Sequence, residues 1–108
     1  MAERSDVQRV LGELEHYLRR TGQWSDERPS RAALESVVPF CCDQLTLAQW
    51  LQFICIGRLH EVLETGDPLP ERCEIRPYAE MVAAQGEAVT AELLHLLQAL
   101  DQTVTEAR

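Results

Sequence analysis

Two segments contain side chains that could act in catalysis, PFCCD at residues 39–43 and RLHEVLE at residues 58–64. Cys41 or Cys42 as nucleophile, His60 as base and Asp43 to orient the imidazole would together form a reactive site, because a nearby imidazole promotes thiolate formation. Their spacing does not specify such a site, and the sequence contains neither a G-x-S-x-G motif nor a glycine-rich phosphate loop. We therefore predict no catalytic residues and no enzymatic activity.

Two E-x-x-H pairs, Glu13 with His16 and Glu92 with His95, match the spacing found in the metal sites of di-iron carboxylate bundles. Both pairs lie away from the apolar stripe of their own helix, by roughly 120° to 180° for the first pair. We therefore expect them to face water and not to meet in a bundle interior. The segment HEVLE at residues 60–64 is half of an H-E-x-x-H zinc motif without its second histidine. The sequence predicts no metal site and no cofactor.

The cysteines are spaced neither as a C-x-x-C redox pair nor as zinc knuckles. They are Cys41, Cys42, Cys55 and Cys73. A bond between two adjacent cysteines would require strained geometry. We predict free thiols that pack as small apolar side chains.

Arg58 and His60 stand out in WLQFICIGRLHEVLE, a helical pattern that is apolar on most sides. On a regular helix Arg58 falls at about 20°, on the apolar face, whereas His60 falls on the wetter side. A buried guanidinium requires a carboxylate partner. The candidates are Asp43, Glu74 and Glu80, and we favour Glu80 because it comes from another helix and would tie two elements together.

The helices that must position these residues are marked by capping signals. Ser5 with Gln8 predicts the start of a first helix that ends near Gly22. Ser30 predicts the start of a short helical segment, and Trp24 is expected to pack the preceding loop onto the core.

The central helix is predicted to begin at a capping box formed by Thr46 and Gln49, with Leu45 and Trp50 in a hydrophobic staple, and to end at Gly66. Pro77 suits the first turn of a following short helix, and a last amphipathic helix runs from about residue 89. No strand pattern competes with these helices. We predict one all-α domain over residues 1–108, a bundle of about four main helices with a buried central helix.

The composition excludes several classes of partner. With 18 acidic and 10 basic side chains, the formal charge of -8 disfavours direct binding to nucleic acid. No apolar run approaches the roughly 20 residues of a membrane span, and the N-terminus has no secretory h-region. We expect a cytoplasmic protein.

The segments PFCCD, WLQFICIGRLHEVLE, DPLP and RPYAEM, in this order, resemble the YqcC-like family of small bacterial proteins of unknown function. The residues that carry the resemblance are Pro39, Phe40, Asp43, Trp50, Leu51, Gln52, Arg58, His60, Pro68, Leu69, Pro70, Pro77, Tyr78, Glu80 and Met81. It implies an all-α bundle of about four helices. Genes of this family often neighbour one for a tRNA pseudouridine synthase, which implies an accessory protein of an RNA-modifying enzyme.

Our leading hypothesis is a non-enzymatic module that binds a protein, namely a tRNA pseudouridine synthase. The charge would speed the encounter with a basic partner, and Trp24, Trp50 and Tyr78 would anchor the interface if they are exposed. The competing interpretation is that all three aromatic side chains belong to the core.

Two alternatives use the same segments. One is a small-molecule site, binding or catalytic, formed by Arg58, His60, Asp43 and Tyr78, in which Arg58 would hold an anionic group. Arg58 and His60 diverge by roughly 160° on a regular helix, which weighs against this site. The other is a homodimer through Trp50 and Phe53, which fall on the otherwise polar side of the central helix.

Overall fold

The protein is an all-α single domain in the computed structural model, which describes residues 2–71 and 73–107. The main elements are α1 (Arg4–Arg20), the central helix formed by α3 (Leu47–Trp50), η2 (Leu51–Ile56) and α4 (Gly57–Thr65), α5 (Ile75–Ala84) and α6 (Ala91–Glu106). Two short pieces, α2 (Arg31–Leu34) and the 3₁₀ turn η1 (Pro39–Cys41), precede the central helix. The described residues form no strand, so the predicted architecture is confirmed.

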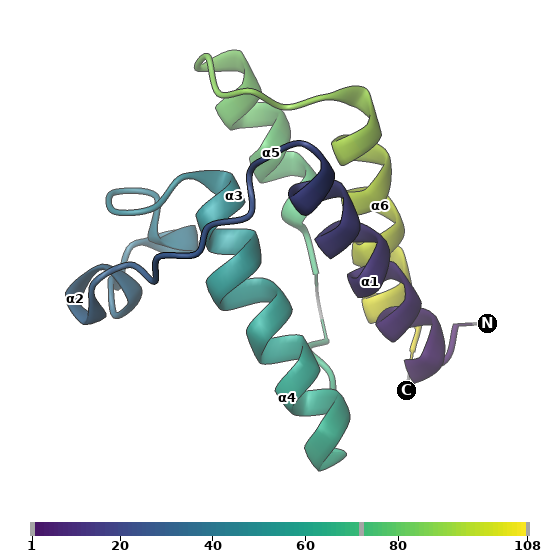
Figure 1. The fold of residues 1–108 in the computed structure, drawn as a ribbon. Helices are drawn as coiled ribbons and strands as arrows, with labels where there is room; N and C mark the ends of the chain where they lie inside the picture. Colours follow the sequence, from purple (N-terminus) through teal and green to yellow (C-terminus); the bar gives the residue numbers. More distant parts are fainter. Residues whose placement is uncertain (1, 72, 108) are drawn as a thin grey trace.

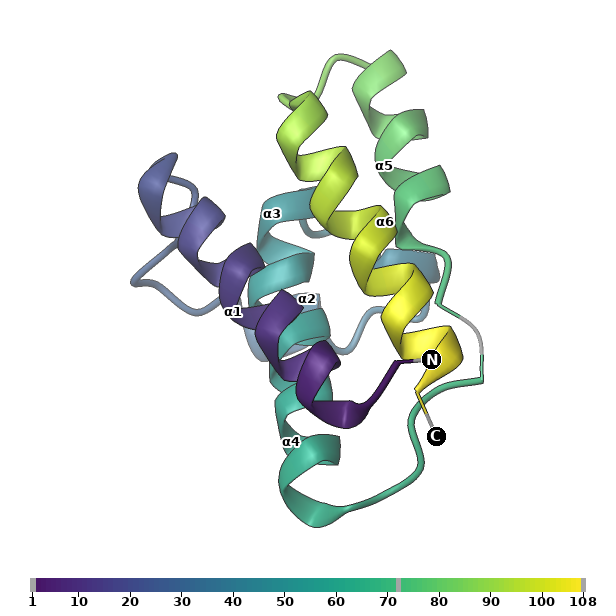
Figure 2. The same ribbon diagram turned by 90° about the vertical axis from the view of Figure 1, so that its right-hand side faces the viewer.

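Helix α6 lies between α1 and α5 and packs against both of them (Figure 2). Helices α1 and α6 are antiparallel, and α5 and α6 lie side by side, joined at one end by a loop (Figures 1 and 2). The phenol of Tyr17 bonds the hydroxyl of Thr90 at 2.6 Å, which joins α1 to the start of α6. Leu11, Leu14, Leu97 and other fully buried side chains fill the space between the helices. Burial of their apolar surface is the main stabilising term of the fold.

The sequence predicted most helix ends correctly. Ser30 accepts the backbone N–H of Ala33, and Thr46 accepts that of Gln49, as a helix N-cap should. Gly66 ends α4 at φ 77°, in the left-handed region that glycine adopts without strain.

The start of α1 was predicted wrongly. The N-terminal bond joins the backbone N–H of Glu3 to the carboxylate of Asp6 at 2.9 Å, instead of joining Ser5 to Gln8. The helix therefore begins earlier than the Ser5–Gln8 pattern suggests, because an acidic pair at Glu3 and Asp6 also satisfies the exposed N–H groups of the first turn.

Gln52 attaches the loop after α1 to the central helix. Its side-chain amide donates to the carbonyl of Ser25 and accepts the N–H of Ser25, both at 2.8 Å. Gln52 is only 8% exposed, so these two bonds satisfy a polar side chain inside the core. In the same loop Trp24 is half-buried against the core, as predicted, and Arg19 lies 4.3 Å from its ring centroid.

The central helix is not a regular α-helix. Its middle section, Leu51–Ile56, is a π-helix, in which the backbone winds more loosely than 3.6 residues per turn. One extra residue in a helix rotates every later side chain by roughly 100° relative to a regular helix. Positions after Ile56, including Arg58, therefore leave the faces that a regular helical wheel assigns to them.

Candidate binding site

A pocket of about 240 Å³ opens between the central helix and the connector that leads to α5. We call it the apolar pocket, and its lining residues are Phe40, Trp50, Ile54, Cys55, Arg58, Leu59, Pro70, Cys73, Glu74, Ile75 and Val104. These residues come from η1, the central helix, the connector, α5 and α6. Apart from Arg58 and Glu74, they present aromatic, aliphatic or thiol surface to the pocket.

Three aromatic rings hold one wall of the apolar pocket. Phe40 stacks on Tyr78 with ring centroids 4.1 Å apart and an interplanar angle of 2°, and it meets Trp50 at 4.8 Å and 59°. Tyr78 is buried, and Trp50 is half-buried. The aromatic residues that the sequence marked as interface anchors are therefore mostly packed within the protein. Trp50 still exposes part of its ring surface to the apolar pocket.

The backbone around this wall is unusual. Phe40 (φ 59°) and Cys41 (φ 50°) both adopt left-handed conformations that cost L-residues about 1–2 kcal/mol each. The π-helical section follows Trp50 directly and places Ile54 and Cys55 in the pocket lining. Strained residues and π-helical turns are both enriched at functional sites. Neither feature was predicted, because positions 40 and 41 are not glycine and no residue within Leu51–Ile56 indicates a π-helix.

Arg58 is exposed at the edge of the apolar pocket, and it makes no ion pair with any residue that the structure describes. The prediction of a buried Arg58–Glu80 pair is therefore wrong. Glu80 pairs with Arg76 at 3.5 Å, and Asp43 is exposed and accepts the hydroxyl of Ser36 at 2.6 Å. The Ser36 hydrogen bond lowers the pKa of Asp43 below its usual value. The π-helical section explains the error, since it rotates Arg58 off the apolar face.

The remaining predicted site residues are dispersed. His60 is exposed, as expected, and does not line the apolar pocket with Arg58. Phe53 is half-buried and also lies outside the pocket lining. Of the predicted site residues, the structure thus brings Trp50 and Arg58 to one pocket, with Tyr78 supporting its wall from behind Phe40.

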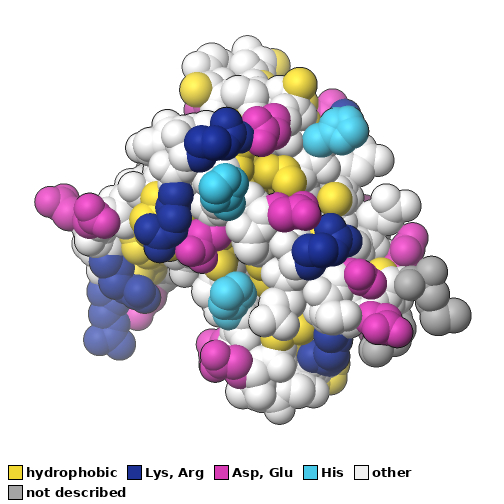
Figure 3. Space-filling view, turned by 45° about the vertical axis from the view of Figure 1, so that its right-hand side comes forward, with side chains coloured by type: hydrophobic (Ala, Val, Ile, Leu, Met, Phe, Trp, Pro, Cys, Tyr) yellow, Lys and Arg dark blue, Asp and Glu magenta, His cyan; other side chains and the backbone are white. Residues whose placement is uncertain are grey.

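The histidines and carboxylates form no cluster of three metal-ligating side chains among the described residues. The three histidine side chains are separated from one another on the face shown in Figure 3, where acidic and arginine side chains lie between them. His16 and His95 of the two E-x-x-H pairs are exposed, as predicted.

The cysteines are free thiols among the described residues. Burial raises the pKa of Cys55 to about 12, and burial together with the carboxylate of Asp101 raises that of Cys73. Both pKa values disfavour the thiolate, which is the nucleophilic form. In the apolar pocket these thiols therefore act as neutral, weakly polar surface.

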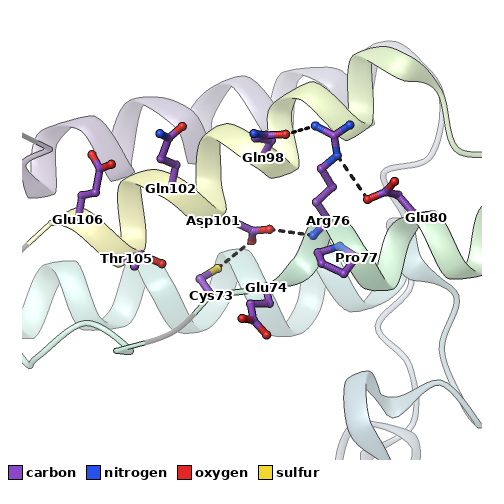
Figure 4. Close-up of a pocket in the computed structure, with 10 residues that line it drawn as sticks. All are labelled: Cys73, Glu74, Arg76, Pro77, Glu80, Gln98, Asp101, Gln102, Thr105 and Glu106. Carbon is purple, nitrogen blue, oxygen red and sulfur yellow. Dashed lines mark hydrogen bonds and ion pairs between the residues drawn. The ribbon is translucent and has the colours of Figure 1, made fainter.

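An acidic groove of about 410 Å³ adjoins the apolar pocket between α5 and α6 (Figure 4). Its lining residues are Cys73, Glu74, Arg76, Pro77, Glu80, Gln98, Asp101, Gln102, Thr105 and Glu106. Cys73 and Glu74 line both sites. The groove thus holds four carboxylates and one guanidinium, and that guanidinium already bonds Gln98 and pairs with Glu80.

Asp101 fixes the boundary between the two sites. Its carboxylate accepts the backbone N–H groups of Ile75 and Arg76 at 2.8 and 2.9 Å, and the thiol of Cys73 at 3.2 Å. A side chain of α6 thereby caps the N-terminus of α5, where a negative charge is favoured by the helix dipole. This carboxylate thus links the connector and the start of α5 to α6.

No helix of the described residues is both long and apolar enough to cross a membrane. A family model described as DUF446, tRNA pseudouridine synthase C, matches residues 6–103. The uncharacterized protein YqcC of Escherichia coli is 34% identical over 95 residues, which are 88% of this chain and 87% of that protein. The solution NMR structure of YqcC superimposes with a TM-score of 0.83 at 31% identity, covering 98% of this chain and 91% of the other.

Two further relatives are similar to this chain over shorter segments. An uncharacterized protein of Haemophilus influenzae is 31% identical over 77 residues, 71% of this chain and 73% of that protein. The tRNA pseudouridine synthase C of Pectobacterium carotovorum is 30% identical over 70 residues, which are 65% of this chain but 19% of that protein. The similarity to the synthase is therefore confined to a segment of a much longer chain.

Proposed function

Because the chain belongs to the YqcC-like family, which the family model and the E. coli relative both show, we propose that it is a non-enzymatic accessory module that binds a tRNA pseudouridine synthase. We place this function in the cytoplasm, where tRNA is modified.

The observation that carries the proposal is the match to the Pectobacterium synthase. A segment similar to this chain makes up 19% of a protein named tRNA pseudouridine synthase C. A domain that is covalently linked to an enzyme acts on it at a high effective concentration. A separate chain of the same type can replace that link only by binding the enzyme with adequate affinity.

The charge of the chain supports the choice of partner. A formal charge of -8 repels the tRNA backbone but attracts an enzyme whose RNA-binding surface is basic. All ten basic side chains of the chain are arginines. Ion pairs with carboxylates of the same chain engage Arg9, Arg19, Arg20, Arg31 and Arg76. The excess acidic charge is therefore available to speed association with a basic partner.

The test is a calorimetric titration of this chain into the tRNA pseudouridine synthase C of the same organism at 50 and 300 mM salt. We expect saturable binding that weakens with salt, because charge attraction contributes to it. A parallel titration with tRNA alone should give no heat of binding. No binding to the synthase at either salt concentration would refute the proposed function.

A second candidate is the binding of a small amphiphilic anion. It is favoured by one observation, the position of Arg58 at the edge of the apolar pocket without an ion pair to any described residue. An aromatic carboxylate would place its ring in the pocket and its charge on the guanidinium. Thermal shift measurements with phenylpropionate and indole propionate test this candidate, and an unchanged melting temperature at millimolar ligand would remove it.

A further inference from the structure

We infer that the apolar pocket and the acidic groove form one docking site for a segment of the synthase in which an apolar side chain is followed by arginine or lysine. This inference rests on the proposed function and adds the surface and the chemistry of the contact.

The two sites form a continuous surface. Cys73 and Glu74 line both of them, so a chain segment that leaves the apolar pocket across this connector enters the acidic groove directly. Asp101 holds the connector in place through its bonds to Cys73 and Ile75. The partner segment therefore meets a surface whose two halves have a fixed relative position.

The apolar pocket has the size of a single anchor side chain. Its volume of about 240 Å³ exceeds the engineered cavity of roughly 150 Å³ that binds benzene, but it is smaller than the usual drug-sized site of about 300–1,000 Å³. A phenylalanine, leucine or tryptophan side chain from a partner fits this range. Interfaces are commonly dominated by one or a few such anchors in a desolvated pocket.

The pocket wall is already formed in the unbound protein. Phe40 is fixed between Tyr78 and Trp50, and its left-handed backbone is held by this packing. A preformed pocket loses less conformational entropy on binding than a flexible surface does. The strain at Phe40 is then explained as the cost of presenting its ring at this position.

The acidic groove selects the charge of the residues that follow the anchor. Its carboxylates come from Glu74, Glu80, Asp101 and Glu106, against the single guanidinium of Arg76. Glu80 pairs with Arg76, and Asp101 accepts the N–H groups at the start of α5, but the lining as a whole still carries more negative than positive charge, so its field favours a cation. An RNA-modifying enzyme with basic surface segments supplies such residues.

Arg58 gives the other end of the site a hydrogen-bond donor. It is exposed at the edge of the apolar pocket and has no ion pair with the described residues. A backbone carbonyl beside the anchor side chain would accept from this guanidinium. The segment thus lies with its apolar residue near Arg58 and its basic residues over α5 and α6.

The experiment measures the affinity of the synthase for the wild-type chain and for two variants by calorimetry at 50 and 300 mM salt. Pro70→Glu places a carboxylate at an exposed position of the apolar pocket. Gln102→Lys/Glu106→Lys cancels the net negative charge of the acidic groove at two exposed helix positions. The matched control, Gln8→Lys/Glu61→Lys, changes the net charge equally at exposed positions outside both sites.

Pro70→Glu should weaken binding by about tenfold or more, the loss typical of a hot spot, even though it adds negative charge. If charge alone governed binding, this variant would bind the basic partner more tightly. Gln102→Lys/Glu106→Lys should also weaken binding by about tenfold at low salt, and its loss should exceed that of the control. Circular dichroism melting curves show whether each variant is folded.

The outcomes separate the inference from the proposed function. If the wild-type chain does not bind the synthase, the proposed function fails, and the inference fails with it. If the wild-type chain binds and both variants bind as the control does, the inference alone is refuted. If light scattering shows a wild-type dimer that Pro70→Glu converts to a monomer, a second copy of the chain occupies the pocket, which also refutes the inference.

Discussion

Phe40 stacks face to face on Tyr78 from a left-handed backbone conformation, with ring centroids 4.1 Å apart and φ at 59°. The stack joins the turn before the central helix to α5. It fixes a ring at the apolar pocket that a regular turn would direct elsewhere. The packing energy of the rings must therefore exceed the strain of the backbone at this residue.

This balance predicts that glycine is a more stable replacement than alanine at position 40, the reverse of the usual order. Phe40→Ala and Phe40→Gly both remove the ring, but only glycine adopts φ 59° without strain. The left-handed strain of about 1–2 kcal/mol outweighs the 0.4–1 kcal/mol by which alanine is usually favoured. We expect Phe40→Gly to be more stable than Phe40→Ala by about 0.5–1 kcal/mol in urea unfolding.

Val37 provides the control, because it is 98% exposed in the same loop and its φ is not positive. There the alanine variant should equal or exceed the glycine variant in stability. If alanine is also the more stable residue at position 40, the strained conformation of Phe40 does not exist in solution.

A second prediction concerns the cap that Asp101 provides to α5. Asp101→Ala leaves the N–H groups of Ile75 and Arg76 without their acceptor, so the free energy of unfolding should fall by about 1–2 kcal/mol. Thr105→Ala, at an exposed position one turn further along α6, is the control and should be close to wild type. Thermal melting followed by circular dichroism makes the comparison. Equal melting temperatures for wild type and Asp101→Ala would show that water satisfies these N–H groups equally well.

A third prediction is that stability decreases at alkaline pH because of two thiols. Burial raises the pKa of Cys55 to about 12, and burial with the Asp101 carboxylate raises that of Cys73, whereas unfolded thiols titrate near 8.5. Above about pH 8.5 the unfolded chain therefore loses protons that the folded chain retains, which favours unfolding by up to about 1.4 kcal/mol per pH unit for each thiol. We expect the free energy of unfolding to fall between pH 9 and 11.

Cys55→Ala/Cys73→Ala should make this pH dependence shallower, although the variant will be less stable at neutral pH. Cys42→Ala, at an exposed thiol, should leave the slope of the wild type unchanged. The measurement is urea unfolding at a series of pH values. An identical slope for the double variant and wild type would mean that the two buried thiols titrate normally in the folded protein.

Caps and apolar periodicity were sufficient to predict the helices, because they depend on local bonds and on one repeating period. Ser30, Thr46 and Gly66 each act as the sequence predicted. The candidate site was predicted less well, since it depends on departures from regular geometry. The π-helical section contains no glycine or proline, and Phe40 is not the glycine that a left-handed position favours, so neither departure was predicted.

The sequence patterns also could not predict contacts between residues that are far apart in the chain. The bonds between Gln52 and Ser25 and between Asp101 and the start of α5 join segments whose relative position is fixed only by the fold. The sequence marked Trp50, Arg58 and Tyr78 as candidate residues, and these do lie in or beside the apolar pocket. It could not identify Phe40 or Asp101 as the residues that shape the site.

The last prediction follows from the exposed position of Arg58. A buried Arg58–carboxylate pair would lose about 3–5 kcal/mol when one partner is removed. Because Arg58 is exposed and has no ion pair with the described residues, Arg58→Met should unfold within about 0.5 kcal/mol of wild type. Leu59→Ala, at the adjacent residue with 6% exposure, should lose about 2–5 kcal/mol and shows that the assay detects core damage on this helix. A loss above 2 kcal/mol for Arg58→Met would mean that Arg58 is paired and buried in solution, and that the regular helical wheel predicts its position better than the π-helical geometry does.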